Sequence, residues 1–423
     1  MSFGNTRHFV FILVLLGTVF VYIIISNVFQ LTQPAPHLKE TGRHSTTEKR
    51  ISAFVLILAQ PRTGSSFLGQ LFNQHPGVFY LYEPLQPFSM FQTLNYVTET
   101  SHATLVASFL RNVSRCRLND FQDYFSFISH SGLSSLHFRL SSKSLSSPPL
   151  CKSEATTFDR QSEILNKCPL LNAKAVSLVC AKKRFVAAKI LTPRLPEVIL
   201  KELFEKFHSP AETQIKIIQL VRDPRAMVWS MIQMGLIERG IKNNNARIDY
   251  SSKKQNSTSQ PLRRRYSATL GHNFIKQVKL LCKRMTKDVN ISLHAWSKRG
   301  ADQHRIVRYE ELARSTFTFA GKIFEFTGID FAQEVKEWLR RDSLFDENGS
   351  SDGERSYSTS NRNITVTINV WRESLTFLET SLIDKECAYF MQKFGYKFID
   401  NVDVLTNISI SLLQPLRNSF YTE

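Results

Sequence analysis

The chain has 423 residues, enough for one α/β domain together with a membrane anchor and a linker, and it carries a formal net charge of +18 at pH 7. Such a charge implies a polyanionic partner. Because the sequence contains no zinc finger, RRM signature or leucine-zipper heptad, we exclude nucleic acid as that partner.

The first predicted element is a membrane-spanning signal-anchor helix at residues 9–29. This stretch contains no charged residue and is long enough to cross a bilayer. Arg7 and His8 precede it without an acidic neighbour, so the positive-inside bias predicts a cytoplasmic tail at residues 1–8 and a luminal remainder, which is type II topology. A cleaved signal peptide is the alternative, but its apolar core is usually only about 7–15 residues long.

Residues 30–50 are predicted to form an extended luminal stem, because they are polar, contain two prolines and show no apolar periodicity. Residues 51–423 are predicted to form one luminal domain. Acceptor triplets for N-glycosylation, Asn-X-Ser/Thr without an intervening proline, support this location. They occur at Asn112, Asn256, Asn290, Asn348, Asn363 and Asn407.

The cysteines give a second, independent indication of a luminal domain. All six follow the predicted anchor, and no two of them form a CxxC pair, which argues against a zinc site and for disulfides. The sequence leaves the pairing open, and buried free thiols are the alternative. The positions are Cys116, Cys151, Cys168, Cys180, Cys282 and Cys387.

Apolar runs alternate with helical patterns along the predicted luminal domain. Residues 52–59 form a nearly unbroken apolar run, which is typical of a strand buried on both faces of a parallel sheet. Similar strands are predicted at 184–190, 216–221 and 304–308, the last leading into a helix at 310–313. The alternation predicts an α/β fold with a central, mostly parallel sheet flanked by helices.

Two stretches interrupt this regular alternation. Residues 129–157 are rich in serine and contain a Pro-Pro pair, and residues 240–265 contain three consecutive asparagines and few apolar side chains. We interpret both as surface insertions.

The segment that follows the first predicted strand favours binding of a phosphate. A loop between a strand and a helix directs backbone N–H groups and the positive helix end toward one point. Gly64 allows the tight turn, and Arg62 supplies a permanent charge with a planar fork. The loop lacks the lysine of a Walker A motif, and a plain helix-capping loop is the alternative. The candidate residues are Gln60, Pro61, Arg62, Thr63, Gly64, Ser65 and Ser66.

A second strand-to-helix junction reads VRDPRAMVWS. Arg222 ends the strand, Asp223 is a good N-cap, and Pro224 suits the first helical position. Ser230 follows six residues after Pro224, about 9 Å along the helix at about 1.5 Å per residue. Arg222 and Ser230 could therefore reach one phosphate beside the helix, although an Arg-Asp-Pro turn alone is usually a helix start with a surface salt bridge.

These motifs make the sequence resemble the Golgi carbohydrate 6-O-sulfotransferases. The resemblance is carried, in order, by ILAQPRTGSSFLGQLFNQHPGVFYLYEPL, IIQLVRDPRAMVWS, RIVRYEELA, NVWRESLTF and ECAYFMQKFGYK, and it extends from about Ile51 to the C-terminus. The tail LTNISISLL is most similar to the keratan-sulfate galactose and chondroitin 6-sulfotransferase branch. The resemblance implies a P-loop-like sulfotransferase fold after an N-terminal transmembrane helix.

The resemblance also implies a donor substrate, 3′-phosphoadenosine 5′-phosphosulfate (PAPS), and residues that bind it. The first loop would hold the 5′-phosphosulfate, with Arg62 to Ser66 as the contacts, although Gln60 and Pro61 replace the small or hydroxyl residues that commonly precede the loop arginine. Arg222 and Ser230 match the positions that hold the 3′-phosphate. The rest of the second motif is expected to position those two residues, namely Asp223, Pro224, Arg225, Ala226, Met227, Val228 and Trp229.

Two further residues match family positions that act on the reacting groups. In related sulfotransferases an acidic residue after the first helix takes the proton of the acceptor hydroxyl, and Glu83 in YLYEP is the candidate for this base. Lys189 in AAKI matches a family lysine and is expected to stabilise the leaving group together with Arg62. The plain alternatives are a helix cap or salt-bridge partner for Glu83 and a structural surface lysine for Lys189.

The resemblance predicts a metal-independent enzyme of the Golgi membrane that moves sulfate from PAPS to the 6-hydroxyl of galactose or N-acetylgalactosamine in keratan- or chondroitin-type glycans. N-acetylglucosamine is the alternative acceptor, and a homo-oligomer is compatible with the pattern. A luminal kinase would need a magnesium site, and the sequence shows no HRD or DFG constellation. A catalytically silent glycan-binding membrane protein is the alternative from another class.

Overall fold

The computed structural model describes residues 51–93, 98–130, 133–199, 214–239, 270–299, 302–344 and 366–415. The predicted cytoplasmic tail, anchor and stem lie outside these residues. Within the described ranges, no helix combines the length and the apolar character needed to cross a membrane.

A five-stranded sheet forms the centre of the fold, in the order β2-β3-β1-β4-β5. Neighbouring strands are parallel throughout. This confirms the predicted parallel α/β architecture and four of its strands, whereas β2 had no counterpart among the predicted strands. The strands are β1 (Ala53–Ala59), β2 (Val78–Tyr82), β3 (Phe185–Leu191), β4 (Gln214–Val221) and β5 (His304–Arg308).

The central strand β1 is apolar along its whole length because both of its faces are covered. Phe54 and Leu56 join the hydrophobic cluster on one face of the sheet. Val55 and Ile57 join the cluster on the other face. All four side chains are buried, as expected where successive side chains point to opposite faces of a sheet that has helices on both sides.

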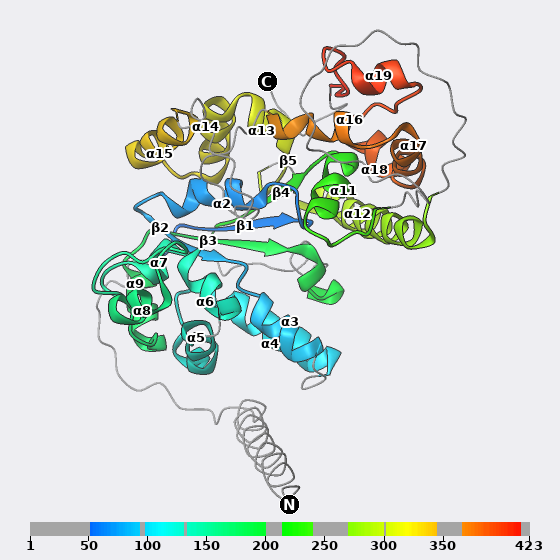
Figure 1. The fold of residues 1–423 in the computed structure, drawn as a ribbon. Helices are drawn as coiled ribbons and strands as arrows, with labels where there is room; N and C mark the ends of the chain where they lie inside the picture. Colours follow the sequence, from blue (N-terminus) through cyan, green and yellow to red (C-terminus); the bar gives the residue numbers. More distant parts are fainter. Residues whose placement is uncertain are drawn as a thin grey trace, which may run out of the picture.

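Helices cover both faces of the sheet and extend beyond its β5 end (Figure 1). One face carries α2 (Ser65–Asn73), α13 (Tyr309–Arg314), α14 (Thr316–Thr327) and α15 (Gln333–Leu344). The other face carries α3 (Gln86–Thr93), α4 (Glu99–Val113), η1 (Asn119–Phe121), α5 (Gln122–Ser129), α6 (Leu133–Leu140), α7 (Lys143–Ser146), α8 (Gln161–Lys167) and α9 (Ala173–Ala181).

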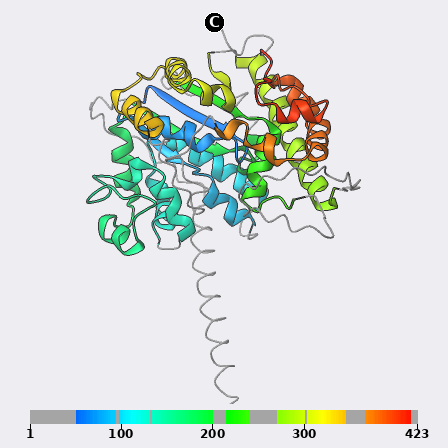
Figure 2. The same ribbon diagram turned by 45° about the horizontal axis from the view of Figure 1, so that its top comes forward.

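A third hydrophobic cluster joins the helix after β4 to the C-terminal helices, which gather at one side of the molecule in Figure 2. Its helices are α11 (Pro224–Gln233), α12 (His272–Arg299), α16 (Val370–Ser374), α17 (Phe377–Glu386), α18 (Ala388–Lys393) and α19 (Val402–Thr406). Two short 3₁₀ turns complete the described elements, η2 (Thr192–Arg194) after β3 and η4 (Val366–Ile368) before α16.

All six cysteines form disulfides, which confirms the expectation of disulfides over free thiols and supplies the pairing that the sequence left open. Cys116 in the turn after α4 pairs with Cys180 in α9, and Cys151 pairs with Cys168. The third disulfide joins Cys282 in α12 to Cys387 between α17 and α18. Each bridge therefore fixes segments that flank the sheet.

The serine-rich stretch 129–157 is not a simple surface insertion, contrary to our interpretation. It contains α6 and α7, and its hydroxyls satisfy the outer edge of β2. Ser142 Oγ accepts a hydrogen bond from the Tyr82 backbone N–H at 2.9 Å, and Ser144 Oγ accepts one from Tyr80 N–H at 3.2 Å. These contacts protect the open edge of a parallel sheet from pairing with another chain. The second predicted insertion, 240–265, lies outside the described residues.

Candidate functional site

The loop after β1 makes a tight turn that begins α2. Gly64 is the N-cap residue with φ 87°, and a Cβ built there would lie 2.3 Å from carbons of the Tyr309 ring. The Gly64 carbonyl accepts the backbone N–H groups of Phe67 and Leu68 at 3.0 and 3.3 Å. Thr63 Oγ1 donates to the Gln60 carbonyl at 2.9 Å. Glycine is thus required both by the left-handed backbone and by the close approach of Tyr309.

The structure brings the two predicted phosphate-binding motifs together. Arg62 Nε donates to Ser230 Oγ at 2.8 Å, and Arg222 Nη1 donates to the Arg62 carbonyl at 3.0 Å. The motifs meet because β1 and β4, which precede them, are adjacent parallel strands whose carboxyl ends share one edge of the sheet. In the sheet, β3 and β2 lie on one side of β1, and β4 and β5 lie on the other, so the strand order changes direction between β1 and β4. Ligands of open α/β sheets bind at such a point, beside the carboxyl ends of the strands.

Arg222 is well placed to hold a phosphate. Its side chain stacks over the Tyr309 ring at 4.5 Å, and its Nη2 donates to the Thr367 carbonyl at 2.9 Å. Both of its main-chain partners are neutral carbonyls, and its buried Nε has no hydrogen-bond partner among the described residues. The charge of Arg222 also acts on the buried carboxyl group of Glu310. A cation that is fixed by two carbonyls and an aromatic ring, with one donor unused, fits an anionic ligand.

The remaining residues of the second motif form the foundation beneath Arg222 and Ser230. Asp223 is the N-cap of α11 and Pro224 takes the first helical position, as predicted. Arg225 is fully buried, donates Nη2 to Asp223 Oδ2 at 2.8 Å and stacks over Trp371. The side chains of Ala226, Met227 and Val228 are buried in the third cluster, with Trp229 packed against it. Because Ala226, Met227 and Val228 are buried in this cluster, we expect their contribution to be positional.

Glu83 lies at the carboxyl end of β2 in a strained conformation. Its φ is 44°, a left-handed value that a residue with a side chain rarely adopts. Its backbone N–H donates to the Lys189 carbonyl at 2.9 Å. The Glu83 carboxylate pairs through Oε1 with Lys189 Nζ and through Oε2 with Arg194 Nη1. The salt bridge that was the alternative expectation for Glu83 is therefore present.

Lys189 is not the surface lysine of the plain alternative, because it is only 2 % exposed. Burial lowers the pKa of its ammonium, Tyr82 opposes that change, and the positive charge of Arg62 adds to the lowering. Its Nζ lies 4.4 Å from the centre of the Tyr82 ring. Lys189 is therefore within electrostatic reach of both Glu83 and Arg62. Arg62 belongs to the loop from Arg62 to Ser66, hereafter the donor loop.

Two charged residues near the carboxyl edge of the sheet, Arg194 and Glu310, were not predicted from the sequence. Arg194 in η2 belongs to the Glu83 cluster, and burial lowers its pKa to about 10, so it stays charged at neutral pH. Glu310 accepts the Asp223 backbone N–H at 2.8 Å and the Tyr396 hydroxyl at 2.9 Å. The position of Arg194 directly after the third strand, five residues beyond Lys189, is the signal that could have identified it.

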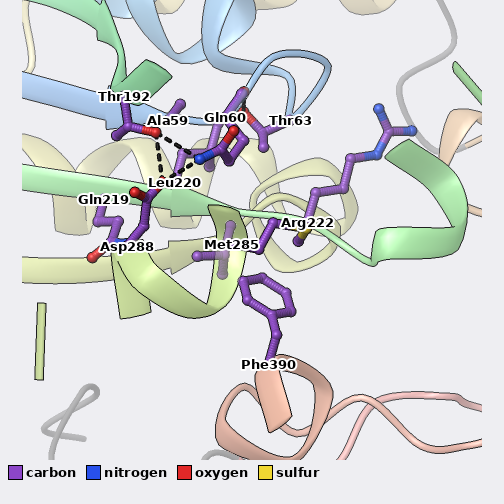
Figure 3. A pocket seen from close by; sticks show the side chains of 11 residues that line it. Ala59, Gln60, Thr63, Thr192, Gln219, Leu220, Arg222, Met285, Asp288 and Phe390 are labelled. Carbon is purple, nitrogen blue, oxygen red and sulfur yellow. Dashed lines mark hydrogen bonds between the residues drawn. The ribbon is translucent and has the colours of Figure 1, made fainter. Parts of the chain in front are cut away.

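A buried polar network supports the donor loop from below (Figure 3). Gln60 Nε2 donates to Thr192 Oγ1 at 2.8 Å and also to Asp288 Oδ2, and Thr192 Oγ1 donates to the same oxygen at 2.5 Å. Burial raises the pKa of Asp288 to about 6, with the hydrogen bonds of Thr192 and Gln60 opposing that rise. Gln60, which departs from the family pattern, therefore ties the loop to α12 and to the turn after β3.

Three of the predicted glycosylation sites fall within the described residues. Asn290 and Asn407 are exposed, whereas Asn112 is half-buried, with its Nδ2 donating to the Ser108 carbonyl at 2.9 Å. The sites at Asn256, Asn348 and Asn363 lie outside the described residues. Glycosylation at each of the six remains a prediction.

Known proteins share the sequence pattern of this chain over most of its length. The chain matches the model of the sulfotransferase domain over residues 53–395, so it is built on that domain. It is 30% identical over 393 residues to carbohydrate sulfotransferase 1 of Rattus norvegicus, which covers 90% of this chain and 88% of that protein. It is 28% identical over 412 residues to carbohydrate sulfotransferase 6 of Homo sapiens, covering 92% and 90%. The chain belongs to the carbohydrate sulfotransferase family.

Among solved structures, the chain is similar to mouse sulfotransferase SULT7A1 complexed with PAP, with 14% identity and a TM-score of 0.34 over 84% of this chain and 86% of that one. The sulfotransferase domain of a Synechococcus olefin synthase gives 17% identity and a TM-score of 0.38 over 83% and 98%. The family assignment rests on the sequence relatives and not on these structures.

Proposed function

We propose that this sulfotransferase uses PAPS to sulfate the 6-hydroxyl of galactose or N-acetylgalactosamine in keratan- or chondroitin-type glycans. The observation that carries the donor assignment is the convergence of Arg62, Arg222 and Ser230 at one edge of the sheet. Arg222 donates to the backbone carbonyl of Arg62, and the Arg62 side chain donates to Ser230, so two cations from different motifs lie at one edge of the sheet, which suits a ligand that carries two phosphate groups. The net charge of +18 suits an acidic glycan acceptor.

In this proposal the donor loop, from Arg62 to Ser66, holds the 5′-phosphosulfate. Arg62 supplies charge, and the N-terminus of α2 supplies backbone donors and a positive dipole end. Arg222 and Ser230 hold the 3′-phosphate. The sharing of Ser230 Oγ between the motifs supports this division, since Arg62 can release that hydroxyl once its own anion arrives.

The proposed transfer is a single displacement at sulfur. A bond forms between the acceptor oxygen and sulfur, and the bond between sulfur and the bridging oxygen of the 5′-phosphate breaks. The acceptor proton moves to Glu83, while the electron pair of the broken bond stays on the phosphate oxygen, where Lys189 and Arg62 stabilise the charge. No oxidation or reduction occurs.

We further propose that the enzyme acts in the Golgi lumen, held by residues 9–29 as a type II anchor. The three disulfides support this location, because such bonds persist in oxidising compartments and are rare in the cytosol. The six sequons and the apolar, uncharged stretch at residues 9–29 support it independently.

The test measures transfer of radiolabelled sulfate from PAPS by the full-length chain in detergent micelles. Acceptors ending in galactose, N-acetylgalactosamine and N-acetylglucosamine are compared side by side, and the product is mapped to the sulfated carbon. We expect 6-O-sulfation of the first two. Preference for N-acetylglucosamine would overturn the acceptor assignment, and binding of 3′-phosphoadenosine 5′-phosphate without any transfer would favour a silent glycan-binding protein.

A further inference from the structure

The Glu83 cluster contains one more cation than is needed to neutralise its carboxylate. Glu83 pairs with two positive side chains, Lys189 from β3 and Arg194 from η2, through different carboxylate oxygens. Lys189 and Glu83 are buried, whereas the Arg194 side chain is 25 % exposed. A second cation on an already paired carboxylate points to a task that the first cation cannot perform alone.

Of these two cations, Lys189 is the one that also interacts with the donor loop. Burial is the main cause of the lowered pKa of Lys189, and the positive charge of Arg62, which belongs to the donor loop, adds to the lowering. In the proposed mechanism Lys189 is drawn toward the leaving phosphate oxygen during transfer. Its hold on Glu83 must then weaken at the moment when the carboxylate has to stay ionised and oriented.

Arg194 has no such second task among its observed contacts. It lies in the turn directly after β3, and its Nη1 contacts the Glu83 oxygen that Lys189 does not use. Glu83 cannot easily turn away, because its left-handed backbone is fixed by the hydrogen bond from its N–H to the Lys189 carbonyl. The carboxylate is thereby held at a defined place between Lys189 of β3 and Arg194 of η2.

We propose that Arg194 is a positioning residue that keeps the Glu83 carboxylate ionised and aimed at the acceptor hydroxyl while Lys189 serves the leaving group. This inference rests on the proposed role of Glu83 as the base. The two neighbouring cations then have different roles, because Lys189 acts on the donor and Arg194 acts on the base.

The charges around Glu83 allow a prediction of pH dependence. Glu83 pairs with Lys189 of β3 and Arg194 of η2. The titratable groups that interact with Lys189 come from β2, the donor loop and α6, and they are Tyr82, Arg62 and His137. The pKa of His137 is lowered by its burial and by the charge of Lys189. The His137 ring contacts Tyr82 edge-on. Since the cations favour ionised Glu83, removal of Arg194 should let it take up a proton at a higher pH.

The test compares pH–rate profiles of the full-length enzyme carrying Arg194→Gln or Arg194→Lys. For Arg194→Gln we expect kcat to fall at least tenfold and the acid limb of the profile to move up by about one pH unit, as expected when one neighbouring opposite charge is lost. Arg194→Lys should keep the acid limb in place, with a smaller loss of kcat. The KM for PAPS should change less than twofold in both, because Arg194 does not contact the donor loop.

Arg160→Gln provides the matched control, since Arg160 is an exposed arginine that pairs with Glu163 on the surface. It should leave rate and profile unchanged. Affinity for 3′-phosphoadenosine 5′-phosphate reports whether each variant is folded. If Arg194→Gln does not fold, Arg194→Lys carries the test, and an acid limb shifted in that variant would overturn the proposal.

Glu83→Gln separates failure of this inference from failure of the proposed base. Full activity in Glu83→Gln would remove the base assignment and the inference with it. Loss of activity in Glu83→Gln together with an unchanged kcat and acid limb in Arg194→Gln would overturn the role of Arg194 alone.

Discussion

The carboxyl group of Asp288 lies beneath the donor loop, where it accepts hydrogen bonds from Gln60 and Thr192. Burial raises its pKa from 3.8 to about 6. Between these values the folded protein holds a proton that the unfolded chain has released, so this group makes stability fall as pH rises from about 4 to about 6.

Asp288→Asn should remove this dependence while keeping an oxygen that accepts both hydrogen bonds. We expect the Tm of the variant, relative to that of the unsubstituted enzyme, to increase between pH 4.5 and pH 7. A pKa shift of about two units corresponds to a change in the free energy of unfolding of up to about 3 kcal/mol. Parallel thermal unfolding at the two pH values measures this. A constant difference would show that Asp288 does not titrate in this range.

The donor loop could be proposed from the sequence because glycine, arginine and hydroxyl side chains between a strand and a helix favour anion binding. Other charged residues at this edge of the sheet were not identifiable. Arg194, Glu310 and Asp288 come from elements far along the chain, and it is the strand order that brings them to one edge. Local composition carries no information on that order.

At the scale of the elements, the central strands were predicted well and the edge strand β2 was missed. β1 and β4 are covered on both faces, and this produces continuous apolar runs. β2 is short, and its outer edge is satisfied by serine hydroxyls from a stretch that looks like a loop in composition. The tertiary contact, and not the local propensity, makes that serine-rich stretch part of the fold.

Ser142→Ala should destabilise the protein by about 1 kcal/mol, because the variant leaves the backbone N–H of Tyr82 without its acceptor. Ser153→Ala, at an exposed position in the same region, should change stability by less than about 0.5 kcal/mol. Urea unfolding of both variants measures the difference. Equal effects would mean that the hydroxyl at 142 does not support the sheet edge.

At the scale of the whole molecule, the disulfides join parts that the sheet alone does not hold together. Cys282–Cys387 spans a sequence separation of 105 and connects α12, which carries Asp288, to the C-terminal helices, whereas Cys151–Cys168 spans 17. If the stabilisation comes mainly from the lower entropy of the cross-linked unfolded chain, the two disulfides contribute about 4.7 and about 3 kcal/mol to the free energy of unfolding.

Replacing both cysteines of a pair by serine should therefore cost more stability for the pair 282 and 387 than for the pair 151 and 168. Thermal unfolding of the two double variants under oxidising conditions gives the comparison. The opposite order would show that native-state packing around the shorter loop outweighs chain entropy.

The account requires that Arg62 and Arg222 bind opposite ends of one nucleotide. The most direct test is to measure, by calorimetry, the binding of 3′-phosphoadenosine 5′-phosphate and of 5′-AMP, which lacks the 3′-phosphate. Arg222→Ala should weaken the affinity for 3′-phosphoadenosine 5′-phosphate at least tenfold, which is the lower limit for the loss of a hydrogen bond to a charged group, and should leave the affinity for 5′-AMP unchanged. Arg62→Ala should weaken both alike. If Arg222→Ala weakened both ligands equally, or neither, Arg222 would not hold the 3′-phosphate and the proposed donor site would be wrong.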